Sequence, residues 1–128
     1  MNDVETLIKK SLNELETLEF LFKNNKFDLT ASRAYYAMYY AVQALFALNK
    51  IVCSSHSGLI STFFNQFVRT GKFSKDIGRL LSNAFDTRQT SDYNFTVEIK
   101  ADDAAESLKQ SRQFVTAILE LINRSKAD

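Results

Sequence analysis

Apolar residues recur at helical spacing in five stretches of the chain, and these stretches predict five helices. Within each stretch the apolar positions advance by three or four residues, as they do along one face of an amphipathic helix. The connection at residues 92–99 loses this period and is expected to be ordered but not helical. The predicted helices cover residues 3–23, 30–49, about 55–71, 75–93 and 100–124.

The segment from Thr30 to Asn49 is the expected centre of the bundle. Its apolar face includes several alanines, whose small side chains allow neighbouring helices to approach closely. Beside that face Arg33, Tyr36 and Tyr40 fall at i, i+3 and i+7, which places them on one stripe of the helix. We therefore expect this helix to serve both packing and recognition.

Small polar residues mark the expected helix ends. Asp28 or Thr30 can cap the second helix, and Ser54 or Ser55 can cap the third. Ser74 can cap the fourth helix, while Gly71 is expected to close the third. The short intervening loops favour antiparallel neighbours.

Composition narrows the fold to an all-α single domain spanning residues 1–128. The chain contains no proline and only 3 glycines, so few positions suit the tight turns of a many-stranded sheet. At 45% hydrophobic residues, a chain of 128 residues can bury a core of its own. We predict an antiparallel up-and-down bundle of four long helices and one shorter helix.

Charge and cysteine content restrict the possible partners. The formal net charge of +1 provides no global attraction for a polyanion, so nucleic acid or nucleotide would have to bind a local patch. Cys53 is the only cysteine, which excludes an internal disulfide and favours a reducing cytoplasm. No apolar run approaches the ~18 residues of a membrane span, and no membrane partner is expected.

The common catalytic signatures are absent from the sequence. There is no glycine-rich phosphate loop, no paired-histidine helix motif and no Gly-x-Ser-x-Gly elbow. A single histidine cannot build a histidine-rich metal site within one chain, so we expect no metal and no cofactor. His56, at the expected start of the third helix, is first of all a capping or surface residue. Alternatively, the helix dipole lowers its pKa and makes it a base near neutral pH.

Two arginines admit both structural and ligand-binding interpretations. Arg33 either makes a bidentate ion pair with a carboxylate, for which Asp92 is the candidate, or binds a phosphate. Arg88, with Gln89 and Tyr93 nearby, can bind a phosphodiester while the ring stacks on a base. The alternative is an Arg88–Asp92 ion pair at i, i+4. Lys72, Lys75 and Arg79 are interpreted as solvated surface.

Three segments resemble, in order and spacing, the short HEPN-domain proteins of bacteria and archaea. They are SRAYYAMYYAVQAL, HSGLISTFFNQFVRTGKF and LSNAFDTRQTSDYNF. The resemblance implies a dimerising helical bundle that binds nucleotides or RNA, or that acts as a metal-independent ribonuclease in toxin–antitoxin or defence systems. It also implies a small nucleotidyltransferase as a possible partner.

The ribonuclease members of that family use an arginine, a polar residue and a histidine a few positions on. Arg88 matches the arginine and Gln89 the polar position, but Tyr93 stands where the resemblance places the histidine. Phe95 replaces the tyrosine that is modified in nucleotidyltransferase-paired members. Tyrosine, with a pKa near ~10, is a poor base at neutral pH, and Phe95 has no hydroxyl to receive a nucleotidyl group. These departures argue against a self-sufficient ribonuclease and against regulation by modification at that position. The only histidine that can replace the missing one is His56, by hypothesis beside Arg88.

Three hypotheses follow for the function. The first is a homodimeric module that binds a nucleotide, RNA or a nucleotidyltransferase partner, and the second is a metal-independent endoribonuclease toxin with Arg88 and His56 as catalytic residues. The third is a structural dimer in which Asp86 or Asp92 ties up the arginines. The ligand groove expected under the first hypothesis comprises Arg33, Tyr36, Tyr40, His56, Arg88, Gln89, Asp92 and Tyr93.

Overall fold

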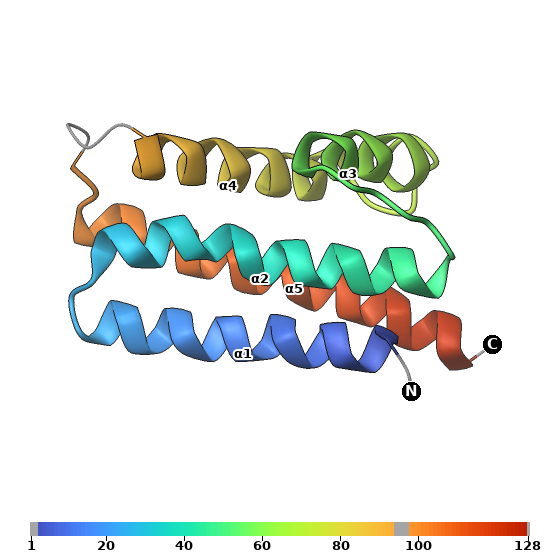
Figure 1. Cartoon of the computed structure of the whole chain (residues 1–128), viewed down its shortest axis with the longest axis horizontal. Coiled ribbons are helices and arrows are strands. Elements are labelled where there is room, and N and C mark those ends of the chain that lie inside the picture. The colour runs from blue at the N-terminus through green and yellow to red at the C-terminus, as the bar shows by residue number, and fades with distance from the viewer. Residues whose placement is uncertain (1–2, 94–97, 128) are drawn as a thin grey trace.

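Five α-helices and one π-helical segment make up the computed structural model of the chain (Figure 1). The structure describes residues 3–93 and 98–127, with only the backbone for residues 91–93 and 126–127. Within these residues there is no strand, so the predicted all-α bundle of four long helices and one shorter helix is confirmed. The elements are α1 (Asp3–Lys23), α2 (Phe27–Leu48), α3 (His56–Phe63), the π segment η1 (Phe64–Val68), α4 (Lys75–Tyr93) and α5 (Ala101–Ala127).

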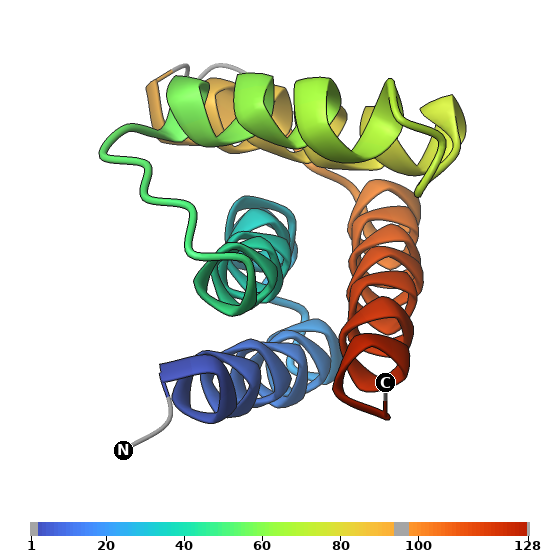
Figure 2. The same cartoon turned by 90° about the vertical axis from the view of Figure 1, so that its right-hand side faces the viewer.

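Helix α2 occupies the centre of the molecule and packs against α1, α4 and α5. In Figure 1 these four helices run roughly along the long axis, with α4 above α2 and α1 below it. Figure 2 shows that α3 instead runs across one end of the bundle, from the side of α2 towards the side of α5. Helix α3 therefore brings its first residues to one face of the molecule and η1 to the opposite face.

The small residues of α2 let the neighbouring helices approach its backbone closely. Its alanines at positions 31, 34, 37, 41 and 44 are all at most 2% exposed. The buried hydroxyl of Ser11 in α1 donates to the carbonyl oxygen of Ala37 at 2.6 Å, and Ser111 in α5 donates to Ala34 at 2.8 Å. The alanine face predicted from the sequence is thus the seam of the bundle. None of the helices in the described part of the chain is both long enough and apolar enough to cross a membrane.

The structure corrects the expected start of the second helix. Helix α2 begins at Phe27, and its N-cap residue Lys26 makes no side-chain capping bond, so neither Asp28 nor Thr30 is the cap. The hydroxyl of Thr30 donates instead to the carbonyl oxygen of Lys26 at 2.8 Å, inside the first turn. The ring of Phe27 packs 5.8 Å from that of Phe22 in α1, and this contact accompanies the earlier start.

The caps predicted for α3 and α4 are confirmed. The side chain of Ser55 accepts from the amide of Gly58 at 3.0 Å, and that of Ser74 accepts from the amide of Ile77 at 3.2 Å. Between these helices, η1 continues α3 before the chain turns at Gly71, whose φ of 84° suits glycine. The paired caps set both the start of α3 and the start of α4.

Candidate functional site

His56 and Tyr35 form a hydrogen-bonded pair where α2, α3 and α4 meet. The hydroxyl oxygen of Tyr35 lies 2.9 Å from Nδ1 of His56. Tyr35 is fully buried on α2, whereas His56, the first residue of α3, is half-buried. The Ser55 cap fixes the start of α3 and so brings the imidazole to this position. The buried phenol therefore orients the ring of the chain's one histidine.

Aromatic rings surround the imidazole of His56. Its centroid lies 4.8 Å from that of Tyr39 and 5.9 Å from that of Phe85, which is nearly parallel to it at 21°. Tyr35 completes the group, with centroids 5.5 Å from His56 and 5.2 Å from Phe85. These contacts join α2 and α4 to the start of α3 and leave the imidazole little room to reorient.

Two arginines flank the ring of Tyr36. The Cζ atom of Arg33 lies 5.0 Å from the ring centroid, and that of Arg88 lies 5.1 Å from it. Both distances are within the ~6 Å over which a guanidinium is attracted to an aromatic face. Because Arg88 is on α4, this arrangement brings it to the tyrosine stripe of α2. Tyr36 and Arg88 are both half-buried, so each keeps part of its surface exposed.

Burial and charge hold His56 neutral near pH 7. Desolvation lowers its pKa below the ordinary 6.5, and the positive charge of Arg88 lowers it further. Burial strongly raises the pKa of Tyr35, so its hydroxyl keeps its proton. If that hydroxyl accepts a hydrogen bond from Nδ1–H, Nε2 is left with a lone pair and can act as a base. If it donates to Nδ1, Nε2 carries the proton and can donate to an anion.

Arg33 is held by a carboxylate, but not by the one expected. Its Nη2 donates to both oxygens of Glu14 in α1, at 2.9 and 2.8 Å. This contact, more than any other, raises the pKa of Arg33. Glu14 therefore takes the role for which Asp92 was the candidate. With 43% of its side chain exposed, Arg33 still presents part of its guanidinium to solvent.

The other predicted site residues lie in different places. Tyr40 contacts the ring of Tyr39 and lies beneath the ammonium of Lys10 at 5.6 Å, on the α1 side of the stripe. Gln89 is exposed on α4. The side chains of Asp92 and Tyr93, and Phe95 as a whole, lie outside the described residues, so the expected Arg88–Asp92 pair is not described. The structure thus brings together Arg33, Tyr36, His56 and Arg88 of the predicted groove.

Sequence reasoning missed the aromatic neighbours of His56. Tyr35 and Tyr39 lie one position before Tyr36 and Tyr40, at an i, i+4 spacing that places them on one face. The apolar period places Phe85 on the inward face of its helix and by itself indicates only packing. The signal that could have found the site was the doubled tyrosine pattern, because a tyrosine inside a packed seam needs a hydrogen-bond partner.

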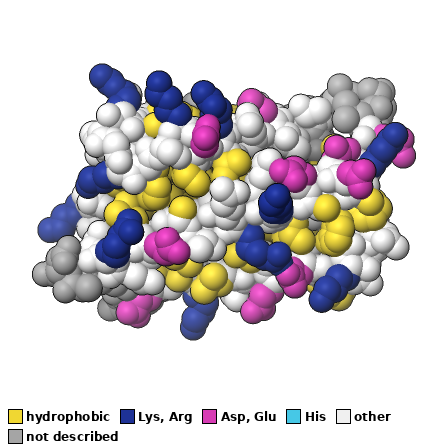
Figure 3. All heavy atoms as spheres, turned by 180° about the vertical axis from the view of Figure 1, so that it is seen from behind, with side chains coloured by type: hydrophobic (Ala, Val, Ile, Leu, Met, Phe, Trp, Pro, Cys, Tyr) yellow, Lys and Arg dark blue, Asp and Glu magenta, His cyan; other side chains and the backbone are white. Residues whose placement is uncertain are grey.

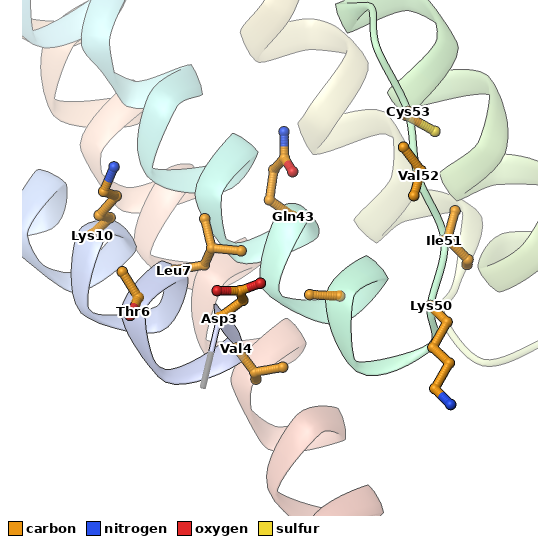
Figure 4. Close-up of a pocket in the computed structure, with 11 residues that line it drawn as sticks. Asp3, Val4, Thr6, Leu7, Lys10, Gln43, Lys50, Ile51, Val52 and Cys53 are labelled. Atoms are coloured by element: carbon orange, nitrogen blue, oxygen red, sulfur yellow. The ribbon is translucent and has the colours of Figure 1, made fainter. Parts of the chain in front are cut away.

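A separate hollow lies elsewhere, between the start of α1, the end of α2 and residues 50–53 (Figure 4). Its volume is about 890 Å³. Figure 4 shows the ammonium groups of Lys10 and Lys50 pointing away from one another, so they do not converge on one ligand. In the part of the chain that the structure describes, no three His, Cys, Asp or Glu side chains are grouped as metal ligands would be.

Comparison with known proteins identifies the family of the chain. The family model described as the HEPN domain matches residues 4–122. The chain belongs to the HEPN domain family. A HEPN relative from Methanocaldococcus jannaschii, named "Putative toxin MJ0142", is 34% identical over 113 residues, which cover 88% of this chain and 77% of the relative.

Other relatives extend the family to bacteria. A UPF0332 protein of Thermotoga maritima is 32% identical over 130 residues, and the match covers 98% of both chains. A second protein of Methanocaldococcus jannaschii, named "Putative toxin MJ0605", is 27% identical over 117 residues, or 91% of this chain and 86% of its own length. The HEPN domain described here therefore has relatives that are named as toxins.

Proposed function

We propose that this HEPN domain binds the phosphate and base of RNA at the surface formed by Tyr36, His56 and Arg88. The observation that carries the proposal is that an aromatic ring, an imidazole and a guanidinium lie near one another, and each of them can contact a different part of an RNA nucleotide. The guanidinium of Arg88 lies 5.1 Å from the Tyr36 ring centroid and close enough to His56 to lower its pKa. A phosphate can accept from the guanidinium, and a base can stack on an adjacent ring.

Arg33 is assigned a supporting part in this proposal. Because its guanidinium is already bonded to both oxygens of Glu14, its charge is largely compensated before any ligand arrives. Its contact with Tyr36 holds the outer side of that ring. We assign Arg88 as the main phosphate contact because it lies beside both Tyr36 and His56, and Arg33 orients the aromatic ring.

The proposal is tested by measuring the affinity of the purified protein for a fluorescently labelled RNA dinucleotide. A ligand of that size fits the surface around Tyr36 without reaching distant charges. We expect Arg88→Ala to weaken binding at least tenfold, which corresponds to the ~1.5–3 kcal/mol of a hydrogen bond to a charged group. The matched control is Arg124→Ala, which removes an exposed arginine of α5. Equal affinities for all three proteins would support a purely structural role for Arg88.

A second function, metal-independent endoribonuclease activity, is favoured by the position of His56. The family histidine is missing after Arg88, but α3 supplies an imidazole whose lowered pKa keeps it neutral near pH 7. In that reaction the 2′-oxygen attacks the adjacent phosphorus and the bond to the 5′-oxygen breaks. Nε2 of His56 takes the proton of the 2′-hydroxyl, solvent protonates the departing 5′-oxygen, and a 2′,3′-cyclic phosphate results.

Incubation of RNA with the protein in the presence of a chelator distinguishes the two functions. Cleavage that yields cyclic phosphate ends, and that is lost in His56→Ala, would establish the ribonuclease. Binding of RNA without cleavage by the parent protein would support a recognition module instead of a ribonuclease. Cleavage at the same rate in His56→Ala would exclude His56 as the proton acceptor.

We further propose that the module acts as a homodimer with a nucleotidyltransferase partner, as the family resemblance implies. Light scattering on the purified chain separates a monomer of 14.6 kDa from a particle of twice that mass. A monomeric particle at micromolar concentration would contradict the homodimer. Co-purification with a co-expressed nucleotidyltransferase encoded beside the gene would support the partner.

A further inference from the structure

The acidic residues are excluded from a long continuous part of the chain. Residues 29–75 contain none of the 15 acidic residues but include five basic ones. Within this region α3 and η1 run across the end of the bundle (Figure 2). Helix α3 and η1 therefore form a band across that end of the molecule that contributes no carboxylate of its own.

A basic groove lies where this band meets α4. Its volume is about 500 Å³, and its lining consists of Phe64, Val68, Arg69, Lys75 and Arg79. Lys72 lies close by, with its ammonium 5.6 Å from the ring of Phe67. Figure 3 shows the back of the molecule, where Lys and Arg side chains gather along the edge formed by η1 and the start of α4.

The cations of the groove are available to a ligand. Arg69, Lys75 and Arg79 are exposed. The one acidic neighbour with a described contact is Asp76, which pairs with Arg79 at 3.1 Å. Because 90% of that carboxylate side chain is exposed, the pair is well solvated and contributes little to stability. A phosphate can therefore replace Asp76 at Arg79 at small cost.

Uncharged polar residues connect the groove to the opposite face. Ser57, Ser61 and Asn65 are exposed and follow one another at intervals of four residues, which places them on one stripe of α3 and η1. This stripe leads from His56 to Arg69, and Asn65 already accepts from the guanidinium of Arg69 at 3.4 Å. Hydroxyl and amide groups suit a sugar–phosphate backbone, since they hydrogen-bond without repelling it.

We propose that this band, from Ser57 along η1 to the groove, binds the backbone of single-stranded RNA. The 13 residue steps from His56 to Arg69 span about 20 Å at ~1.5 Å per step. At ~3.4 Å per nucleotide of a stacked strand, about six nucleotides cover that distance. A linear polyanion with phosphates at regular intervals fits this band and its aromatic groove floor better than an acidic peptide does. This surface goes beyond the proposed site at Arg88 and does not require it.

The test compares a 12-nucleotide single-stranded RNA with the dinucleotide over a range of salt concentrations. Each phosphate contact contributes ~0.7 to the steepness of the plot of log affinity against log salt concentration. R69A/K75A/R79A removes three such contacts, so the plot should become shallower by about 2. The control K9A/K23A/K109A removes the same charge from exposed positions elsewhere. It should leave the slope nearly unchanged. The groove variant should also leave dinucleotide affinity unchanged.

Three outcomes would overturn the proposal. The first is an equal slope for the groove variant and the parent protein, and the second is the same change in slope for both triple variants. The third is binding of polyglutamate that is as tight as binding of RNA and that is weakened equally by loss of the three cations. Failure of the dinucleotide alone to bind would count against the Arg88 site and leave the band intact. Circular dichroism of each variant verifies that the exposed substitutions preserve the helical fold.

Discussion

The hydroxyl of Tyr35 lies 2.9 Å from Nδ1 of His56, and this contact fixes the chain's one imidazole at the junction of α2, α3 and α4. Tyr35 is fully buried at the seam of the bundle. The same side chain that packs the core therefore also determines which nitrogen of His56 faces the surface. This pair links the packed seam of the bundle to the surface that we propose for recognition.

The titration of His56 should have its midpoint below pH 6.5. Burial and the charge of Arg88 both disfavour the imidazolium. Because the unfolded chain binds that proton more tightly, the free energy of unfolding should fall as the pH is lowered through 6.5 towards the folded-state pKa. Since this is the only histidine, its NMR signals need no assignment. Arg88→Ala should raise the midpoint but leave it below 6.5, whereas a midpoint at or above 6.5 in the parent would contradict the electrostatics.

Replacing the hydroxyl of Tyr35 should affect His56 more than replacing that of Tyr39 does. Tyr35→Phe removes the partner of Nδ1, and we expect it to lower the free energy of unfolding by ~1 kcal/mol and to change the tautomer seen in ¹⁵N spectra. Tyr39→Phe is the matched control, because the Tyr39 hydroxyl accepts instead from Gln43 at 2.6 Å. Identical ¹⁵N shifts in the two variants would show that the Tyr35 bond does not set the tautomer.

The turn after η1 should depend on glycine at position 71. A Cβ at Gly71 meets no atom within 4 Å, so its φ of 84° is the only obstacle to a larger residue. Gly71→Ala should therefore lower the free energy of unfolding by ~1 kcal/mol in urea denaturation. Gly71→Asn should cost less, because asparagine tolerates this conformation. A neutral Gly71→Ala would mean that the turn relaxes to another conformation.

The two arginines beside Tyr36 should differ in their importance for binding. Arg33 is bonded to Glu14 through both carboxylate oxygens, so Arg33→Ala should weaken dinucleotide binding less than Arg88→Ala does. Glu14→Gln removes the compensating charge and should strengthen binding. A larger loss in Arg33→Ala than in Arg88→Ala would reverse the assignment of the main phosphate contact. Fluorescence titration of each variant measures the difference.

The sequence predicted the bundle well because its signals are local. The apolar period and the serine caps at Ser55 and Ser74 depend on residues three or four positions apart, and the structure confirms them. The predicted start of α2 was wrong. The helix begins earlier, at Phe27, whose ring packs on Phe22 of a different helix. Such contacts depend on how the helices are placed, which a periodic pattern does not specify.

The site illustrates the same limit. The stripe of Arg33, Tyr36 and Tyr40 was visible at helical spacing, yet Glu14 as the partner of Arg33 comes from another helix. Tyr40 lies on the expected stripe but at its α1 side, over Lys10. The pairing of Tyr35 with His56 joins residues 21 positions apart across two elements. The doubled tyrosine pattern therefore signals a hydroxyl that needs a partner, but it does not identify His56 as that partner.

The most direct test of the account follows the His56 imidazole by NMR while an RNA dinucleotide is added at pH 7. The account predicts saturable shifts of its ring signals and a rise in its pKa, because a bound phosphate stabilises the imidazolium. Both effects should be lost in Arg88→Ala and kept in Arg124→Ala. Ring signals of His56 that stay unchanged at saturating dinucleotide would contradict a binding surface shared by Tyr36, His56 and Arg88.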